Sequence, residues 1–334
     1  MVYPSGKTIA FTYATQGSYG TERPASISVN GANVVTNITY APGTGALAGW
    51  TYGNGQSMSR TFDTDGRITN NGLGTIGYDT ADRVTSYTAG AESYTYTYDA
   101  RDRLTAVAGS ATQSYGYDTS GNRTSQTVGG TSRAFTIAAG SNRLASATTP
   151  STTFAYDATG ALTSDGTRTF TYDALGRVTG GGGATYARNG SGQRVAKTVG
   201  GVTTVFFYDG AGRLLGEYTS SGTTIQEYVY LGNMPVAIVQ PTSTYYVKAD
   251  ELNTPRAVVD TAGTTVWSWA RLPFGENAPS GSFTLNLRFP GQYYDAETGT
   301  MENHMRVYDP KLGRYLQSDP AGLHGGLNTY AYVK

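Results

Sequence analysis

Along much of the chain, aromatic and hydroxyl side chains alternate one by one. In the clearest stretch Tyr94, Tyr96 and Tyr98 are separated by Thr95 and Thr97. A period of two places the rings on one face of a β-strand and the hydroxyls on the other, and helical spacing is absent. The pattern predicts strands that bury an aromatic face and leave a hydroxyl face able to meet water.

A short motif follows these strands repeatedly. It consists of an aromatic residue, an Asp, a few turn-forming residues, usually a Gly, and an Arg. Its copies recur at steps of roughly 16 to 22 residues, and such a repeat determines the architecture before any other motif does. They are Phe62-Asp63 with Gly66-Arg67, Tyr78-Asp79 with Arg83, Tyr98-Asp99 with Arg103, Tyr117-Asp118 with Gly121 and Arg123, Tyr172-Asp173 with Gly176-Arg177, and Tyr208-Asp209 with Gly212-Arg213.

Each copy of the motif is interpreted as the turn of one β-hairpin. An Asp carboxylate accepts a hydrogen bond from the backbone two residues further on, and Gly176 or Gly212 can adopt positive φ without strain. Two strands of about seven residues plus two turns use about 20 residues, which matches the step. The sequence therefore predicts an all-β fold of antiparallel hairpins wound into a spiral or shell around a space, with residues 1–240 as the wall.

Some copies of the motif are degenerate. Tyr156-Asp157 has Ala161 in the place of Arg, and Tyr186-Ala187-Arg188 has lost the Asp. Ser141-Asn142-Arg143-Leu144 is interpreted as a decayed copy in the long gap between Asp118 and Tyr156. Tolerance of such decay favours a structural role of the repeat over catalysis.

Composition excludes several classes of function. The net charge is zero and 14% of residues are charged, against roughly 25% in an average soluble protein, so no basic surface is expected to attract nucleic acid. The chain has no cysteine, hence no disulfide or thiolate metal site, and the sequence indicates no cofactor. No apolar run reaches the length of about 18 residues that a membrane span needs, and the N-terminus lacks a signal sequence.

The C-terminal third has a different texture and carries specific motifs. These are Tyr246-Val-Lys-Ala-Asp250 through Thr254-Pro255-Arg256, Val266-Trp267-Ser-Trp269, Pro273-Phe274-Gly275, Asn286-Leu287-Arg288-Phe289-Pro290-Gly291-Gln292-Tyr293-Tyr294-Asp295, Arg306-Val-Tyr308-Asp309-Pro310, Gly313-Arg314-Tyr315 and Ser318-Asp319-Pro320-Ala-Gly322. Together with the repeats they resemble the bacterial rearrangement-hotspot (Rhs) or YD-repeat family. The resemblance covers nearly the whole chain and implies a wall at 1–240 and an Rhs-associated core, a truncated C-terminal cap, at 241–334.

Members of the family resemble hollow β-sheet cocoons that enclose a variable C-terminal toxin. The resemblance therefore implies a structural module that sequesters a toxin, is made in the cytoplasm, and is secreted or delivered by a secretion system or within a toxin complex. We expect the chain to be the last part of a shell, ending before the toxin, with a hydroxyl-rich inner face and open sheet edges that favour self-association. An extracellular carbohydrate-binding or adhesion array is the alternative, because tyrosine rings beside hydroxyls suit sugars; tyrosine is also an ordinary strand residue.

The resemblance also implies chemistry in the cap, where related proteins act as aspartyl autoproteases. It places one acid at Asp319 and a supporting cation at Arg306, with the second Asp expected beyond residue 334. Such chemistry needs two carboxylates that share a proton, so the chain by itself is predicted not to cleave. The other interpretation is that Asp319 forms a turn and Arg306 is a strand residue paired with a carboxylate; Asp295 and Asp309 each follow a Tyr and resemble repeat turns.

The remaining candidate residues point to structure. His304 and His324 are the two histidines, and without an ordered set of carboxylates they are interpreted as surface or packing residues. Gly180–Gly183 lacks the strand-then-helix context of a phosphate-binding loop and is expected to be a flexible loop between hairpins. Trp267 and Trp269 share one strand face and are expected to pack in the cap.

Overall fold

The computed structural model describes residues 1–16 and 19–332, and it confirms the predicted all-β fold. Within each sheet, hydrogen-bonded neighbours are consecutive in the sequence, so each sheet is an antiparallel meander. The first sheet contains β1 (Ile9–Gln16), β2 (Tyr19–Val29), β3 (Ala32–Tyr40), β4 (Leu47–Tyr52) and β5 (Ser57–Ser59).

Two further sheets and a short ribbon form the rest of the wall. The second sheet comprises β6 (Thr61–Phe62), β7 (Ile68–Asn70), β8 (Thr75–Tyr78), β9 (Val84–Ala89), β10 (Glu92–Tyr98), β11 (Leu104–Gly109), β12 (Gln113–Tyr117), β13 (Arg123–Val128), β14 (Thr131–Ile137), β15 (Leu144–Ala147) and β16 (Thr152–Thr153). The ribbon is β17 (Ala155–Tyr156) with β18 (Leu162–Ser164). The third sheet comprises β19 (Phe170–Tyr172), β20 (Val178–Gly181), β21 (Ala184–Arg188), β22 (Arg194–Val199), β23 (Val202–Tyr208), β24 (Leu214–Thr219), β25 (Thr224–Leu231), β26 (Met234–Val239), β27 (Thr244–Ala249), β28 (Pro255–Val259), β29 (Thr265–Ser268) and β30 (Ser280–Gly281).

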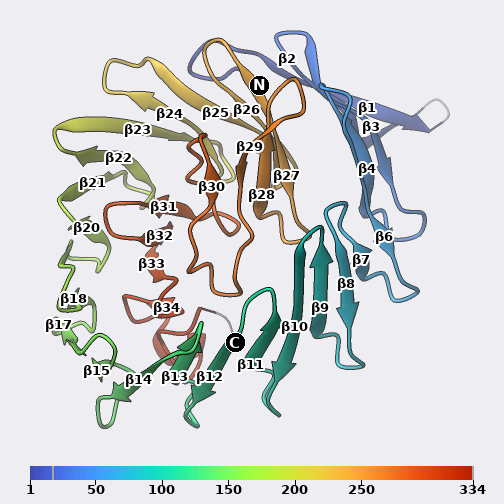
Figure 1. The fold of residues 1–334 in the computed structure, drawn as a ribbon. Coiled ribbons are helices and arrows are strands. Elements are labelled where there is room, and N and C mark those ends of the chain that lie inside the picture. Colours follow the sequence, from blue (N-terminus) through green and yellow to red (C-terminus); the bar gives the residue numbers. More distant parts are fainter. Residues whose placement is uncertain (17–18, 333–334) are drawn as a thin grey trace.

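The last segment folds into a small sheet of its own. It contains β31 (Tyr293–Asp295), β32 (Thr300–Asn303), β33 (Arg306–Asp309) and β34 (Arg314–Tyr315), followed by the 3-10 helix η1 (Gly322–Gly325). Figure 1 shows this segment inside the curve of the wall, beside β19–β22. We call residues 283–332 the inner segment.

The wall bends round until its ends meet (Figure 1). Arg256 on β28 forms an ion pair of 2.7 Å with Glu92 at the start of β10, and its guanidinium lies over the Tyr87 ring. Asn71 donates to Glu251 at 2.7 Å across the same junction. One turn of the predicted spiral is therefore closed by contacts between residues more than 150 positions apart in sequence.

The aromatic face of the wall points inward. Phe206, Leu214 and Tyr228 of the wall pack with Phe289 and Tyr308 of the inner segment in one buried cluster. The hydroxyls form ladders on the exposed face, such as Thr61 with Thr69 and Thr171 with Thr179. The expected hydroxyl-rich inner face is therefore wrong: the side that is covered by the inner segment is the side that buries rings, and water meets the threonines.

The N-terminal sheet packs against the face of the third sheet that points away from the inner segment. Trp50 and Tyr52 are buried with Val229 and Val236 in a shared core. The Tyr52 hydroxyl donates to the carbonyl of Val247 at 2.7 Å. This stacking of β1–β5 on β24–β28 is the start of a second layer of the spiral. The pairing of β26 with β27 runs through residue 240, and the division into wall and core at that residue stays a prediction.

Candidate functional site

The turn motif is a self-contained hydrogen-bonded unit. In the copy at Asp99, Oδ1 accepts the backbone N–H groups of Arg101 and Arg103 at 2.9 and 3.1 Å. Oδ2 accepts Nε of Arg103 at 2.7 Å. The side-chain hydrogen bond from Arg103 lowers the pKa of Asp99 to about 2, so the carboxylate is ionised at neutral pH.

The same motif also joins each hairpin to the next one. The Arg83 guanidinium lies 5.3 Å above the centre of the Tyr98 ring, and the Tyr98 hydroxyl donates to the carbonyl of Val84 at 2.7 Å. Equivalent stacks link Arg67 to Tyr78, Arg103 to Tyr117 and Arg213 to Tyr230. The tyrosine, aspartate and arginine of each copy therefore have a structural role, because they hold one hairpin against the next. The loss of motif residues in some copies indicates the same role.

One detail of the predicted motif needs correction. Asp118 is bonded to Asn122, four positions on, and Arg123 instead stacks on the Phe274 ring at 3.9 Å. In the copies that pair as at Asp99 the arginine stands four residues after the Asp, whereas at five its side chain leaves the turn on the other face of the strand. The Gly180–Gly183 run lies between the hairpins β19–β20 and β21–β22, as expected. Gly180 and Gly181 end β20, and Gly182 and Gly183 form the turn into β21, where a Cβ at Gly182 would lie 2.2 Å from the carbonyl oxygen of Glu297.

Sequence reasoning missed further turns closed by an Asp, among them the two that follow β27 and β28. Asp250 accepts the backbone N–H of Thr254 at 2.9 Å, and Asp260 accepts that of Thr264 at 2.8 Å. Both lack the arginine at the fourth position, so the available signal was an Asp four residues before a Thr at the end of a strand. The degenerate copy with Asn189 survives, because its amide oxygen accepts the N–H of Gln193 at 3.0 Å.

Buried ion pairs attach the inner segment to the wall. Arg194 on β22 donates to Asp295 at 2.6 Å, and Lys197 contacts the same carboxylate at 3.2 Å. Arg188 forms two hydrogen bonds with Glu302, at 2.8 and 2.9 Å. The backbone carbonyl of Asp295 also accepts Gly299 N–H at 2.7 Å, so the predicted turn is present while its side chain serves a longer-range contact.

Asp309 combines the two roles in the same way. Its Oδ1 accepts the backbone N–H groups of Lys311 and Leu312, as in a repeat turn, and its Oδ2 pairs with Arg168 of the wall. The carboxylate is completely buried, so the pair fixes the position of β33 against the wall.

In a second buried network the described partners of the carboxylate are all neutral. Glu217 accepts hydrogen bonds from Gln226 at 3.0 Å, from Tyr293 at 2.8 Å and from the Tyr228 hydroxyl. Burial, followed by the charge of Glu217, raises the pKa of Tyr228 well above 10, so its hydroxyl stays a donor. Nothing in the sequence distinguishes Glu217 from a surface residue of an ordinary strand.

The structure brings together the two residues proposed for cap chemistry. Arg306 contacts Asp319 at 3.0 Å, and its guanidinium lies 3.7 Å from the centre of the Tyr315 ring. Oδ1 of Asp319 accepts the N–H of Ala321 at 2.9 Å, which is the bond of a turn-forming Asp. Gly325 lies against the same carboxylate, since a Cβ there would be 2.8 Å from Oδ2.

This arrangement holds one carboxylate in a fixed orientation. Among residues 1–16 and 19–332, no second carboxylate is hydrogen-bonded to Asp319. The site can orient a carboxylate, whereas acid–base chemistry of the dyad type needs a partner acid. Both the turn and the strand ion pair expected in the non-catalytic interpretation are present, and the catalytic interpretation stays a prediction.

The other candidate residues are placed as follows. His304 and His324 are exposed, on the β32–β33 turn and in η1. Trp267 and Trp269 are buried together against Phe289, as expected. In the described part of the chain no group of three or more His, Asp and Glu residues is arranged to hold a metal ion. None of the described helices has the length and apolar character to cross a membrane.

Comparison with known proteins agrees with this architecture. Residues 73–325 match the family "Teneurin YD-shell". The chain is 29% identical over 184 residues to "Double-stranded DNA deaminase toxin A" of Burkholderia cenocepacia, covering 44% of this chain and 13% of that protein. It is 38% identical over 89 residues to "Toxin protein Tse5" of Pseudomonas aeruginosa, covering 26% of this chain and 7% of that protein.

Solved structures show the same fold. A chain in the Photorhabdus luminescens Tc holotoxin pore superimposes with a TM-score of 0.77 at 17% identity, covering 98% of this chain and 20% of that one. The present chain therefore spans a minor part of each relative named here. The kinship with Rhs and YD-repeat proteins expected from the motifs is confirmed, and the chain belongs to the Teneurin YD-shell family.

Proposed function

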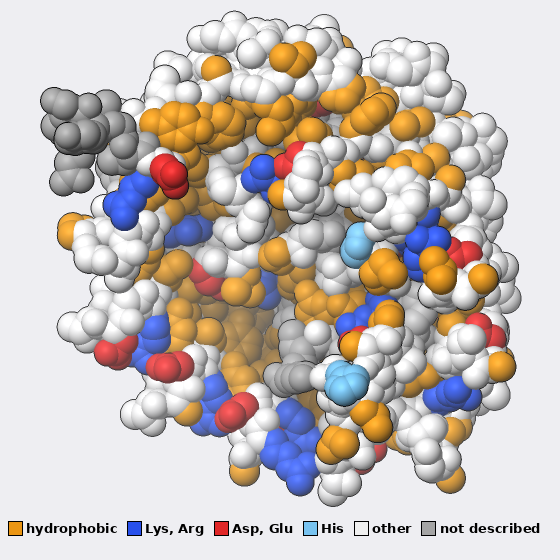
Figure 2. Space-filling view, turned by 180° about the vertical axis from the view of Figure 1, so that it is seen from behind, with side chains coloured by type: hydrophobic (Ala, Val, Ile, Leu, Met, Phe, Trp, Pro, Cys, Tyr) orange, Lys and Arg blue, Asp and Glu red, His pale blue; other side chains and the backbone are white. Residues whose placement is uncertain are grey.

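We propose that this chain is a wall segment of a shell that encloses a polypeptide toxin until its delivery. The observation that carries the proposal is the closed turn of the wall, joined by Arg256 and Glu92 around the inner segment. A meander with an aromatic inner face is stable only when that face is covered, and here curvature and the inner segment cover it together. Figure 2 shows the molecule hollowed on one side, with hydrophobic side chains in its depth and charged side chains near its edge.

The path of the chain fits an enclosed cargo. Tyr332 stacks on Tyr308 with ring centroids 4.5 Å apart and also contacts Phe289 and Tyr315. The last described residues therefore lie within the curve of the wall (Figure 1). A polypeptide joined to this end starts from the inside of the shell.

The relatives support a toxin as the cargo. Both curated relatives named above are toxins, and the structural neighbour is part of a toxin complex. We infer that the chain works in a secreted or delivered assembly, with a toxin and toxin-complex components as partners, and that its open sheet edges pair with further shell strands. A glycan-binding array is not favoured, because the repeat tyrosines are occupied by arginine stacking and carbonyl hydrogen bonds.

Protection of an attached polypeptide tests the proposal. A protease-sensitive reporter is fused after Lys334, and the matched control carries the same reporter before Met1. We expect the C-terminal reporter to be cleaved at least tenfold more slowly, and Arg256→Met, which opens the junction with Glu92, to remove most of the difference. Equal cleavage of both reporters in the parent protein contradicts the enclosing role.

For the cap we propose that Asp319 is one acid of an aspartyl pair and that Arg306 orients it. The ion pair of 3.0 Å supports this role, and the partner Asp is expected after residue 334. The test is a chain extended through the next Asp-Pro sequence, followed by denaturing electrophoresis. We expect a discrete self-cleavage product that disappears in Asp319→Asn and persists in the control Asp99→Asn, a turn-forming Asp of the wall; cleavage by Asp319→Asn removes that residue from the chemistry.

A further inference from the structure

Three consecutive copies of the turn motif, which close the turns after β12, β14 and β17, all depart from the pattern. The first has Asn122 in the place of the arginine, and the third has Ala161 there. The second has lost the aspartate and is one residue longer, which puts Asn142 ahead of its arginine. Copies with a paired arginine precede and follow them, at Asp99 and Asp173, so the three departures are neighbours along the wall.

Asparagine side chains connect the first two of these copies to residues 327–330, which we call the tail. Nδ2 of Asn122 donates to Oδ1 of Asn142 at 2.9 Å. Oδ1 of Asn122 accepts a hydrogen bond from Nδ2 of Asn328 at 3.1 Å, and Nδ2 of Asn142 donates to the carbonyl of Leu327 at 2.7 Å. One chain of amide hydrogen bonds therefore joins two turns of the wall to the tail.

The third copy holds the other end of the tail. The Tyr330 hydroxyl donates to the carbonyl of Gly160 at 2.7 Å, and the Tyr330 ring packs edge-on against Tyr156 with centroids 6.2 Å apart. The Arg314 guanidinium lies 4.6 Å from the centre of the same ring. Tyr330 is buried, so the tail is anchored to the wall at both of its ends.

The positions that have lost the arginine are covered by the inner segment. Asn122 and Ala161 are each 2% exposed, whereas the side chains of Arg83 and Arg213 in complete copies are 30% exposed. Directly after Ala161, the next backbone N–H donates to the carbonyl of Leu316 at 3.0 Å. An arginine at either position would have to displace the inner segment, so the smaller residue fits the contact.

The tail supplies a hydrogen-bond acceptor to the cap site. The carbonyl of Thr329 accepts the backbone N–H of Asp319 at 2.8 Å and Nη1 of Arg306 at 3.4 Å. Thr329 lies between Asn328 and Tyr330, the two residues whose side chains are bonded to the wall. A displaced tail would therefore take this acceptor away from both members of the ion pair.

We propose that these three copies of the motif are specialised to seat the tail, and that by fixing Thr329 they set the position of Asp319 relative to Arg306. Asn122 and Asn142 are accordingly positioning residues of the cap site. The catalytic consequence rests on the function proposed above for Asp319, whereas the seat itself is a property of the chain as it stands.

Hydrogen–deuterium exchange at the Asp319 amide, measured on the full chain, tests the seat. This amide is bonded to the Thr329 carbonyl, so its exchange reports whether the tail is in place. Asn142→Ala removes the bond to Leu327, and Asn122→Arg restores the motif; each is expected to accelerate the exchange about tenfold. Asn142→Gln keeps a side-chain amide and is expected to stay within about threefold of the parent.

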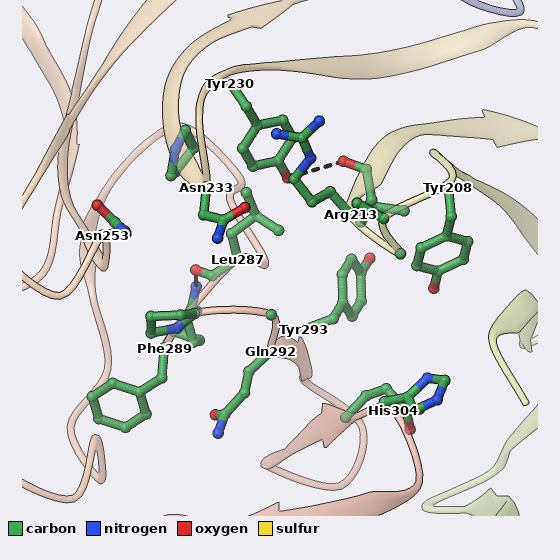
Figure 3. A pocket seen from close by; sticks show the side chains of 18 of the residues that line it. Tyr208, Arg213, Tyr230, Asn233, Asn253, Leu287, Phe289, Gln292, Tyr293 and His304 are labelled. Atoms are coloured by element: carbon green, nitrogen blue, oxygen red, sulfur yellow. Dashed lines mark hydrogen bonds between the residues drawn. The ribbon is translucent and has the colours of Figure 1, made fainter.

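Another departure from the motif provides the matched control. Asn189 stands there in the place of the aspartate and bonds to Gln193 at the position of the arginine. Gln193 lines a pocket of about 280 Å³ together with His304 and with Tyr208, the tyrosine of the next copy, so an arginine has room at this position (Figure 3). Gln193→Arg is therefore expected to restore the motif without changing the exchange at Asp319.

Self-cleavage of the chain extended through the next Asp-Pro sequence gives the second readout. We expect Asn142→Ala to slow this reaction about fivefold and Asn142→Gln to restore most of the rate, at an unchanged midpoint of urea unfolding. If the extended parent does not cleave, the acid pair proposed for Asp319 fails, and the exchange measurement still decides whether the seat exists.

Four results overturn the proposal. They are unchanged exchange at Asp319 in both Asn142→Ala and Asn122→Arg, equal acceleration in Gln193→Arg, equal acceleration of the backbone amides of β9–β11, and, in an extended chain that cleaves, an unchanged rate in Asn142→Ala despite faster exchange.

Discussion

The buried pair of Arg194 and Asp295 provides the sharpest test of how the inner segment is held. Their side chains are 1% and 2% exposed, and the nitrogen–oxygen distance is 2.6 Å. Removing one member of a buried pair leaves an uncompensated charge and typically costs about 3–5 kcal/mol, whereas replacing both members by apolar residues is often nearly neutral. The two single changes and the double change are therefore expected to differ strongly from additivity.

The structure ranks the individual changes. Asp295→Leu removes the counter-charge of Arg194 and also a contact of Lys197, so its cost should lie at the upper end, about 5 kcal/mol. Arg194→Met leaves Asp295 with Lys197 at 3.2 Å, so its cost should be about 3 kcal/mol. The double variant should lose less stability than Asp295→Leu alone, because no unpaired charge remains.

Urea unfolding followed by tryptophan fluorescence measures these values, since Trp267 and Trp269 lie in the core shared by wall and inner segment. The matched control is the contact of Arg67 with Asp65 at 3.3 Å, in which the Asp65 side chain is 69% exposed; this pair is expected to show little coupling. If the losses of the two single variants at Arg194 and Asp295 add within about 0.5 kcal/mol, the pair does not attach the inner segment and the reasoning fails.

Three further predictions concern the turns and the buried carboxylate. Burial raises the pKa of Asp209, but hydrogen bonds from Arg213 outweigh it and lower the pKa overall. Asp209→Asn should therefore lower the free energy of unfolding by about 1 kcal/mol at pH 7. The difference in stability between parent and variant should vanish in urea unfolding as the pH falls from the ordinary value of 3.8 through the lowered pKa. Gly182→Ala should lower stability by about 2–4 kcal/mol, because the added Cβ would meet Glu297. The control Gly200→Ala, which has a similar φ and open space around it, should lower stability by about 1 kcal/mol. Thermal melts resolve this difference. Tyr228→Phe should cost about 1–3 kcal/mol in urea unfolding, because buried Glu217 loses a donor; an unchanged midpoint contradicts the network.

The strands and turns were predictable because their causes are local. Alternation at Tyr94–Tyr98 fixes the period, and the Asp99 carboxylate closes its own turn through atoms within four residues. The same locality explains the error at Arg123. A motif read as aromatic, Asp and a nearby Arg does not specify the spacing, whereas the Asp118 carboxylate bonds to the residue at the fourth position, which is Asn122.

Which face of the wall strands points inward was not predictable, because this depends on the segment that packs inside the curved wall. Alternation states that rings and hydroxyls lie on opposite faces, but the inner segment has no regular period that would place it inside or outside. The contacts that decide the matter, such as Arg194 with Asp295 and Tyr293 with Glu217, join residues far apart in the sequence. For the same reason Glu217 carried no signal, since its two tyrosine partners come from different elements.

The cap pair shows how resemblance and geometry differ as evidence. The resemblance placed Asp319 and Arg306 at one site, and they are 3.0 Å apart. The local geometry alone is also that of an ordinary turn, since Asp319 accepts the N–H of Ala321 as Asp99 accepts that of Arg101. A fixed carboxylate is therefore common to both interpretations, and only a second acid distinguishes a catalytic Asp from a turn-forming one.

A meander in which each strand bonds to its sequence neighbours has few long-range contacts of its own. The turn motif compensates locally, because each arginine stacks on the next tyrosine and transmits the register from hairpin to hairpin. The turn motif cannot set the curvature of the wall, since its copies make nearly the same contacts. Curvature is set where the wall meets something else, at Arg256 with Glu92 and along the buried pairs of the inner segment. The repeat thus defines a ribbon, and a small number of charged contacts turns that ribbon into an enclosure.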